Sequence, residues 1–264
     1  MRLLLFTLII SALLSFEASA EYNLATKKEE HIFFSTASEV RLGRSLAEKV
    51  EEKFKICKDI KLQERVDRIG QQLASLCGRK DITYSFIVLK EDEVNAFALP
   101  GGYVYVNKGA IEKTDSDDEI AAILAHEVAH IAARHSIKRL QASIGYNILS
   151  MLALAASKDV RFKRGADLAF SQIMLGYSRE DEFLADRLAV KYVEEAGYDP
   201  EAVIVFMEKL KRIQKEMPLK PLMPSFVRTH PYLPERIAAA KQELFGKMDF
   251  NDYINREISD YEER

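Results

Sequence analysis

The sequence predicts an α+β fold that is mostly helical. Apolar residues recur at helical spacing through most of the chain, whereas β-branched and aromatic residues gather only between residues 82 and 106. No internal repeat and no linker rich in Pro or Gly divides the chain. We therefore expect one domain over residues 21–264, preceded by a separate leader at residues 1–20.

The leader has the pattern of a secretory signal peptide. Arg2 precedes an apolar run from Leu3 to Leu14, and Ala18-Ser19-Ala20 presents the small residues that a signal peptidase recognises. The run is too short for a lasting transmembrane helix. We expect cleavage after Ala20 and export of the remaining chain, with an uncleaved N-terminal anchor as the alternative.

The predicted elements of the exported part follow the apolar patterns in chain order. Helices are expected at residues 23–56 and 62–76, strands at 82–89, 95–99 and 103–106 with a turn at Pro100-Gly101-Gly102, and helices again from Asp117, with breaks, to the C-terminus, with loops near Gly165 and over 218–224. The small sheet therefore lies between two helical regions of the sequence.

The third strand is expected to lie at the edge of this sheet. It contains Tyr103, Val104, Tyr105 and Val106. An edge strand offers unpaired N–H and C=O groups to which an extended peptide can add. Ordinary sheet packing is the alternative, and both can hold because successive side chains point to opposite faces.

Composition and charge narrow the classes of function. The net charge is −3 and the sequence pI is about 6.0, so no basic field points to a nucleic-acid partner. The two cysteines, Cys57 and Cys77, are too few for a disulfide-dense scaffold. In an oxidising compartment they are expected to form one disulfide, with two buried thiols as the alternative. The apolar stretch at residues 143–156 is too short to cross a bilayer; core packing and contact with a membrane or substrate both remain open.

The residues with the clearest chemistry are His126-Glu127-Val128-Ala129-His130, which lie in an apolar helical run. Two His at positions i and i+4 are about 40° apart around a helix and about 6 Å apart along it, so both imidazoles can bind one Zn²⁺. Glu127 is offset by about 100° and can reach a metal-bound water rather than the metal. Two polar residues on an ordinary helix are the alternative interpretation. His135 lies further round the same helix and is not expected to be a ligand.

A catalytic zinc site needs a third protein ligand, and an acidic helix supplies candidates. Residues 178–186 read SREDEFLAD, in which Glu182 and Asp186 are again separated by one turn. Glu182 can be the ligand, while Asp186 holds the far nitrogen of a zinc-bound His. Glu180 and Asp181 compete for the ligand role, and a solvated acidic face is the alternative for the whole cluster.

These segments together resemble a family of zinc metallopeptidases. HEVAH followed by SREDEFLAD resembles the metal-binding motifs of the family that includes HtpX, the CAAX prenyl proteases and the periplasmic proteases BepA, LoiP and YcaL. EVRLG at 39–43, NAFALPGGYVYVNKG at 95–109 and THPYLPERI at 229–237 resemble further family segments in the same order. The resemblance implies a gluzincin-type fold with a small antiparallel sheet and the zinc between two helices. In the sequence we find neither the multiple transmembrane helices nor the helical-repeat region that some relatives have. We therefore expect the chain to be most similar to the short periplasmic members.

The resemblance also implies roles for residues of the site. His126, His130 and Glu182 would bind one Zn²⁺ per chain, with Glu127 as the general base. His230 would lie at the site, either as a hydrogen-bond donor to the oxyanion, which is the preferred role, or as an occupant of the open zinc position. Arg236 would support the same anion or brace the loop.

The function implied is that of an exported zinc endopeptidase in the periplasm. Its substrates would be misfolded or misassembled envelope proteins, with peripheral contact with the membrane or the outer-membrane assembly machinery and no nucleic-acid partner. A chaperone-like envelope factor that binds client chains, with little or gated proteolysis, is the alternative. A pure binder would not need Glu127, which favours the enzyme.

Overall fold

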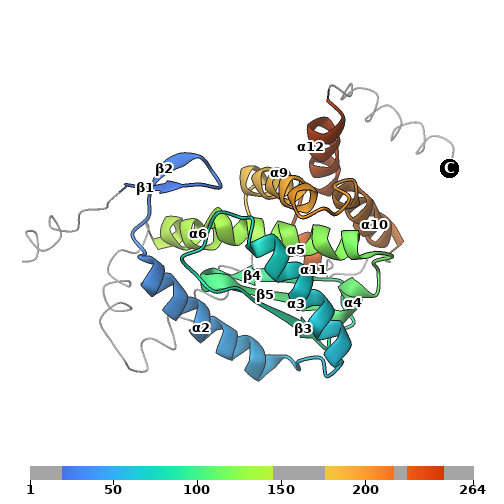
Figure 1. Cartoon of the computed structure of the whole chain (residues 1–264), viewed down its shortest axis with the longest axis horizontal. Helices are drawn as coiled ribbons and strands as arrows, with labels where there is room; N and C mark the ends of the chain where they lie inside the picture. Colours follow the sequence, from blue (N-terminus) through green and yellow to red (C-terminus); the bar gives the residue numbers. More distant parts are fainter. Residues whose placement is uncertain (1–19, 145–175, 217–224, 247–264) are drawn as a thin grey trace, which may run out of the picture.

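A computed structural model describes residues 20–144, 176–216 and 225–246 of the chain (Figure 1). Its elements are β1 (Ala20–Asn23), β2 (Lys28–His31), α2 (Thr36–Lys53), α3 (Ile60–Ala74), β3 (Ser85–Leu89), β4 (Ala96–Leu99), a 3₁₀ turn (Pro100–Gly102), β5 (Tyr103–Asn107), α4 (Lys108–Ile111), α5 (Asp117–Ala132), α6 (His135–Ile144), α9 (Arg179–Glu195), α10 (Ala202–Glu216), α11 (Ser225–Thr229) and α12 (Leu233–Phe245). The mostly helical α+β class is confirmed.

Several predictions lie outside the described residues. They are the leader up to residue 19, the loops near Gly165 and over 218–224, and residues 145–156 of the apolar stretch. Among the residues that are described, helices that combine the length and the apolarity needed to cross a membrane do not occur.

The expected long helix over residues 23–56 is wrong in its first part. The side chain of Asn23 accepts hydrogen bonds from the backbone N–H groups of Ala25 and Thr26, which closes a turn between β1 and β2. The helix α2 begins only after Ser35, whose hydroxyl accepts from the N–H of Ser38. Local polar side chains therefore convert the predicted helix into a hairpin followed by a shorter helix.

The central sheet is mixed rather than antiparallel, which corrects a second expectation. Its order is β3-β5-β4, with β5 parallel to β3 and antiparallel to β4. The strand containing Tyr103, Val104, Tyr105 and Val106 is therefore central and hydrogen-bonded on both sides, not at the edge. Gly101 and Gly102 both have positive φ values, 77° and 101°, which allows the tight turn that joins β4 to β5. Within the described residues the edge strands of this sheet are β3 and β4.

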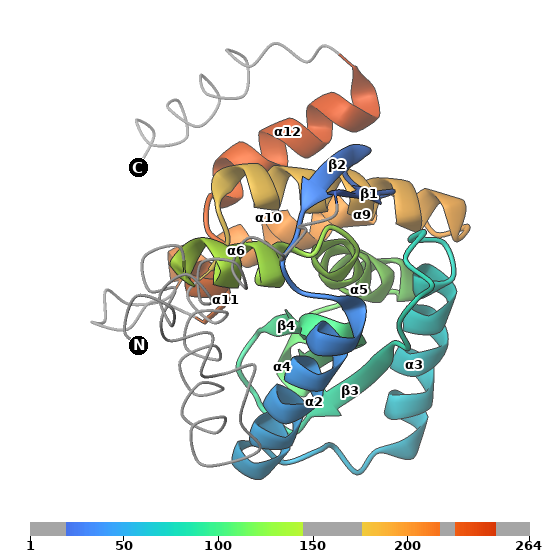
Figure 2. The ribbon, with the colours of Figure 1, turned by 90° about the vertical axis from the view of Figure 1, so that its left-hand side faces the viewer.

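The sheet separates two apolar layers (Figure 2). Tyr105 faces α2 and lies in a cluster with Leu46 and Val50. Val104 and Val106 point to the opposite face, into the larger core formed with α3, α5, α9, α10 and α12. Both ribbon views place α5 between the sheet and α9. Because α5 is covered on two sides, the polar side chains along its second half are enclosed within the protein.

The two cysteines do not form the expected disulfide. Both Cys57 and Cys77 are free and buried. The N–H of Cys57 donates to the carbonyl of Val88 near the end of β3, whereas the thiol of Cys77 contacts the hydroxyl of Tyr84, just before the start of that strand. The alternative of two buried thiols is the one that the structure shows.

Candidate metal centre and active site

Four buried side chains from three segments converge on one point. His126 and His130 come from α5, Glu182 from α9 and His230 from the turn after α11, and one ligand atom from each lies within 4.8 Å of all the others. Ser116 caps α5, and Ser178 forms a capping box with Asp181 at the start of α9. These caps fix where each helix begins and thus which turn presents its site residues.

The separations between the four donor atoms fit a tetrahedral metal. The Nε2 atoms of His126 and His130 are 3.0 Å apart, and Nδ1 of His230 is 3.2 Å from both His126 Nε2 and Glu182 Oε1. His130 Nε2 lies 3.5 Å from Glu182 Oε1. Ligands at about 2.0–2.1 Å from a tetrahedral zinc are about 3.3 Å apart, so these distances match the edges of such a tetrahedron.

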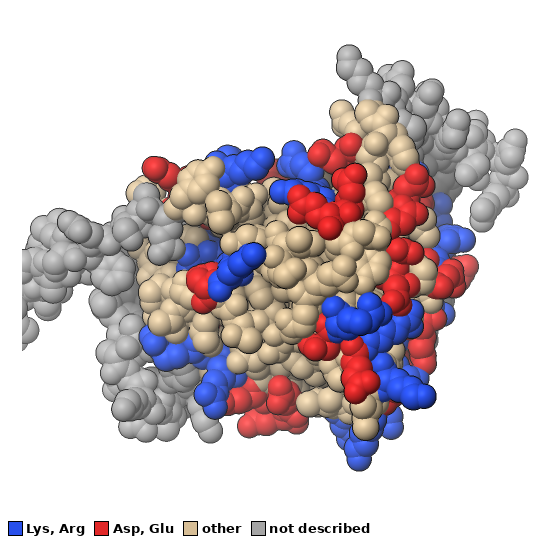
Figure 3. All heavy atoms as spheres, viewed as in Figure 1, with Lys and Arg blue, Asp and Glu red and all other residues tan. Residues whose placement is uncertain are grey.

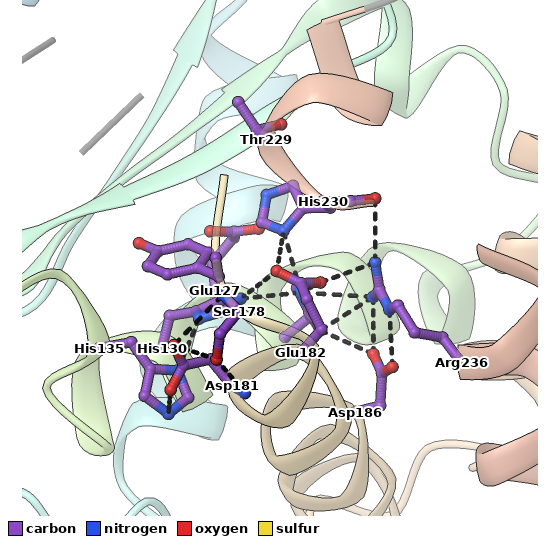
Figure 4. A network of polar contacts seen from close by, with 12 residues as sticks. Glu127, His130, His135, Ser178, Asp181, Glu182, Asp186, Thr229, His230 and Arg236 are labelled. Atoms are coloured by element: carbon purple, nitrogen blue, oxygen red, sulfur yellow. Dashed lines mark hydrogen bonds and ion pairs between the residues drawn. The ribbon is translucent and has the colours of Figure 1, made fainter. Parts of the chain in front are cut away.

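Asp186 and Arg236 surround the outer side of this cluster, as Figure 4 shows. Asp186 Oδ1 is 2.9 Å from Nδ1 of His126, on the side of the ring away from the other donors. Arg236 contacts both Asp186 oxygens at 2.7 Å and Glu182 Oε2 at 2.8 Å. The structure therefore brings together the expected ligands, Glu127, Asp186, His230 and Arg236, but neither the strand at residues 103–106 nor the two cysteines belongs to this cluster.

The buried charges of the site do not balance on their own. Glu127, Glu182 and Asp186 are carboxylates with at most 2% exposure, and Arg236 is the fixed cation among them at 4%. Burial raises the pKa of Glu182 and Asp186, but Arg236 opposes this and holds both below their usual range. With the histidines neutral, as metal ligands must be, three carboxylates against one guanidinium leave two negative charges, which a divalent cation would neutralise.

Glu127 lies beside the cluster without joining it. Its Oε1 is 3.4 Å from Nε2 of His230, and its Oε2 has no hydrogen-bond partner among the described residues. Burial raises the pKa of this carboxyl group, and nearby His230 opposes the rise. An oriented carboxylate with raised basicity and a free oxygen is suited to accept a proton from water.

Two residues near His130 were not identified as site residues from the sequence. His135 places its Nδ1 2.8 Å from Nδ1 of His130, and burial lowers the pKa of His135 to about 4. The Tyr177 ring stacks on His130 with ring centroids 3.9 Å apart. If α5 continued unbroken, His135 would lie on a different face of the helix from His130. No local sequence pattern predicts that Tyr177 contacts α5.

An apolar cavity of about 60 Å³ opens from the polar cluster. It is lined by His126, Glu127 and His230 and by side chains from α10, α11 and the start of β4. Its apolar walls include Val94, Ala96, Val203, Phe206, Met207, Leu210 and Phe226. The outer surface is different in character, with acidic and basic side chains interspersed around an uncharged area on the face in Figure 3.

Comparisons with known proteins agree with this site. The beta-barrel assembly-enhancing protease of Escherichia coli (strain K12) is 25% identical over 218 residues, which are 78% of this chain and 44% of that protein. The mitochondrial metalloendopeptidase OMA1 of Schizosaccharomyces pombe is 31% identical over 179 residues, or 68% of this chain and 52% of that protein. The chain thus spans about half the length of these relatives.

The family model that matches the chain is described as Peptidase family M48 and covers residues 61–244. That span includes both His of the HEVAH helix, the acidic helix and the segment with His230 and Arg236. It covers more than half of the chain, and it confirms the resemblance to zinc metallopeptidases. The chain therefore belongs to peptidase family M48.

Proposed function

We propose that this protein is an exported zinc-dependent endopeptidase with its catalytic domain in residues 21–264. The observation that carries the proposal is the buried cluster of His126, His130, Glu182 and His230, with Glu127 directly beside it. Membership of a peptidase family supports the reaction class. A binding factor of the chaperone type would have no use for a buried general base.

His126, His130 and Glu182 would hold the zinc through two imidazole nitrogens and one carboxylate oxygen. When bound, zinc lowers the pKa of a coordinated water and polarises the substrate carbonyl. Glu127 would accept the proton of the attacking water and return it to the departing amine. Asp186 would fix the tautomer of His126 by accepting the proton on its Nδ1, and Arg236 would hold Asp186 in place.

His230 is best explained as a fourth, displaceable ligand rather than as an oxyanion donor. Its Nδ1 faces the donor atoms at 3.2 Å, and its Nε2 faces Glu127 at 3.4 Å, so its ring fills the space between the base and the cluster. It belongs to the turn after α11 rather than to a helix that supplies the other ligands. We propose that this arrangement holds the enzyme inactive until the turn moves, which departs from the donor role preferred from the sequence.

An extended peptide would bind along β4 rather than along the central strand. β4 is an edge strand of the sheet, and Asn95 and Ala96 at its start line the cavity next to Glu127. The cavity would take the side chain beside the scissile bond. The apolar lining of this cavity, about 60 Å³ in volume, suits a small apolar side chain.

The proposed substrates are misfolded or misassembled envelope proteins, and the proposed compartment is the periplasm. The similarity to a beta-barrel assembly-enhancing protease and the signal-peptide pattern of residues 1–20 support both. N-terminal sequencing of protein from a periplasmic extract should begin at Glu21. An intact Met1 in the membrane fraction would contradict cleavage.

Two variants test the reaction itself. Glu127→Gln should keep about one zinc per chain, measured by elemental analysis, and lose hydrolysis of an unfolded protein, because an amide cannot accept the proton. Glu182→Ala should lose both zinc and hydrolysis, whereas Glu180→Ala on the same helix is the matched control and should keep both. A Glu127→Gln protein that still cleaves would refute the role of Glu127. Full rescue of a deletion strain by Glu127→Gln would favour the binding factor.

A further inference from the structure

His135 lies against a proposed zinc ligand because the chain reverses between two helices. α5 ends at Ala132, Arg134 adopts a left-handed conformation with φ of 56°, and α6 begins at His135. This break brings His135 back toward His130, so that their Nδ1 atoms are 2.8 Å apart. Both rings are buried, with exposures of 1%.

The hydrogen bond between the two rings has one consistent direction. His130 presents Nε2 to the donor cluster, so a neutral ring carries its proton on Nδ1 and donates it. His135 must then accept on Nδ1 and carry its own proton on Nε2. That Nε2 faces Oδ1 of Asp181 at 3.4 Å without a formed hydrogen bond, and the capping box with Ser178 holds this carboxylate in place.

Stacking alone does not decide which edge of His130 faces the metal. Tyr177 lies nearly parallel to the His130 ring, at 16°, and its hydroxyl is 2.8 Å from that of Ser136. A half-turn of the imidazole about its Cβ–Cγ bond keeps the stacked plane but exchanges Nε2 for a carbon atom. The hydrogen bond at Nδ1 is the contact that distinguishes the two orientations.

We propose that His135 is a positioning residue, whose Nδ1 accepts the Nδ1 proton of His130 and holds Nε2 of His130 toward the zinc. This inference rests on the proposed function. His126 has the carboxylate of Asp186 in the corresponding place. A neutral acceptor behind His130 avoids a further buried carboxylate in a site that already holds three, and the carboxylate of Asp181 lies beyond His135 in a side chain that is 31% exposed.

Two substitutions of His135 separate an acceptor role from simple packing. In His135→Asn the amide oxygen replaces Nδ1 at nearly the same position, whereas His135→Leu fills the space without an acceptor. The zinc dissociation constant, measured by competition with a chelator, should rise about 10- to 100-fold in His135→Leu and stay close to the wild-type value in His135→Asn. His31→Leu removes an exposed imidazole from β2 and is the control that should change nothing.

The outcomes distinguish this inference from the proposed function. If the wild-type protein binds zinc and hydrolyses peptides but His135→Leu retains full affinity, or His135→Asn is as weak as His135→Leu, the positioning role is overturned alone. A wild-type protein that binds no zinc overturns the proposed function. If His135→Leu does not fold, ¹⁵N NMR of the zinc-loaded wild type decides: a proton on Nε2 of His135 supports the role, and a proton on its Nδ1 overturns it.

Discussion

Replacing Arg236 with Met should destabilise the protein more than any loss of a surface ion pair. The guanidinium is 4% exposed and makes two contacts of 2.7 Å with Asp186 and one of 2.8 Å with Glu182. Met keeps much of the packing volume but leaves two buried carboxylates without their cation. Removing one partner of a buried ion pair costs about 3–5 kcal/mol, and for a domain of this size the Tm should fall by about 6–20 °C.

The pH dependence of this loss follows from the same contacts. In the metal-free protein the pKa values of Glu182 and Asp186 are below their usual range, since Arg236 outweighs the effect of burial. Their contribution to stability is therefore present above about pH 4, the usual value of free carboxyl groups, and is lost as the pH falls through the lowered values. The difference between wild type and Arg236→Met should be largest near pH 7 and shrink in acid.

Urea unfolding in the presence of a chelator measures the effect without zinc. Arg44→Met is the matched control, because Arg44 pairs with Glu48 at 3.4 Å on the surface, where such a pair contributes little. Adding Asp186→Asn to Arg236→Met should restore part of the stability, because it removes an uncompensated charge. If Arg236→Met unfolds at the same urea concentration as Arg44→Met, Arg236 does not balance the carboxylates and the charge argument for a divalent metal fails.

Three further predictions concern the metal and the substrate. Burial lowers the pKa of His126, but Asp186 and Glu182 raise it to about 9, so zinc must displace a proton from this ring. The affinity for zinc should therefore increase about tenfold for each unit by which the pH rises toward 9, and less steeply in Asp186→Asn. An unchanged affinity from pH 6 to 8 would contradict this. His230→Ala should keep zinc and raise kcat, whereas a fall of about 10²-fold would restore the oxyanion-donor role. Met207→Ala enlarges the cavity, so cleavage of a peptide library should shift toward sites with larger apolar side chains. Val205→Ala, which changes an exposed residue of the same helix, is the control.

The residues of HEVAH and SREDEFLAD could be predicted because their geometry is local. In an α-helix the positions i and i+4 share a face, so His126 with His130, and Glu182 with Asp186, are related by the helix itself. The predicted strands also agree with the structure to within a few residues, since β-branched runs beside a Pro-Gly-Gly turn are typical of strands. Fold class and ligand-bearing helices therefore follow from short-range patterns.

Strand order and the contacts made by Arg236 and Tyr177 could not be predicted from these patterns. Tyr103 to Val106 has the composition of a strand, but its central place depends on β3 pairing with it on the side opposite to β4. Arg236 lies 50 residues from Asp186, and Tyr177 reaches His130 only after the chain returns to α5. Pairing and packing between remote segments decide these positions, and no local spacing encodes them.

The break after α5 shows how a tertiary contact can override local helical preference. The residues around Arg134 would continue the helix, and a left-handed conformation costs a residue other than glycine about 1–2 kcal/mol. The Arg134 side chain offsets this cost through Nε, 3.0 Å from Glu39 Oε2, and through a 2.7 Å hydrogen bond to the carbonyl of Phe34. Glu39 lies on α2, so a helix on the far side of the sheet holds the turn that directs His135 to His130.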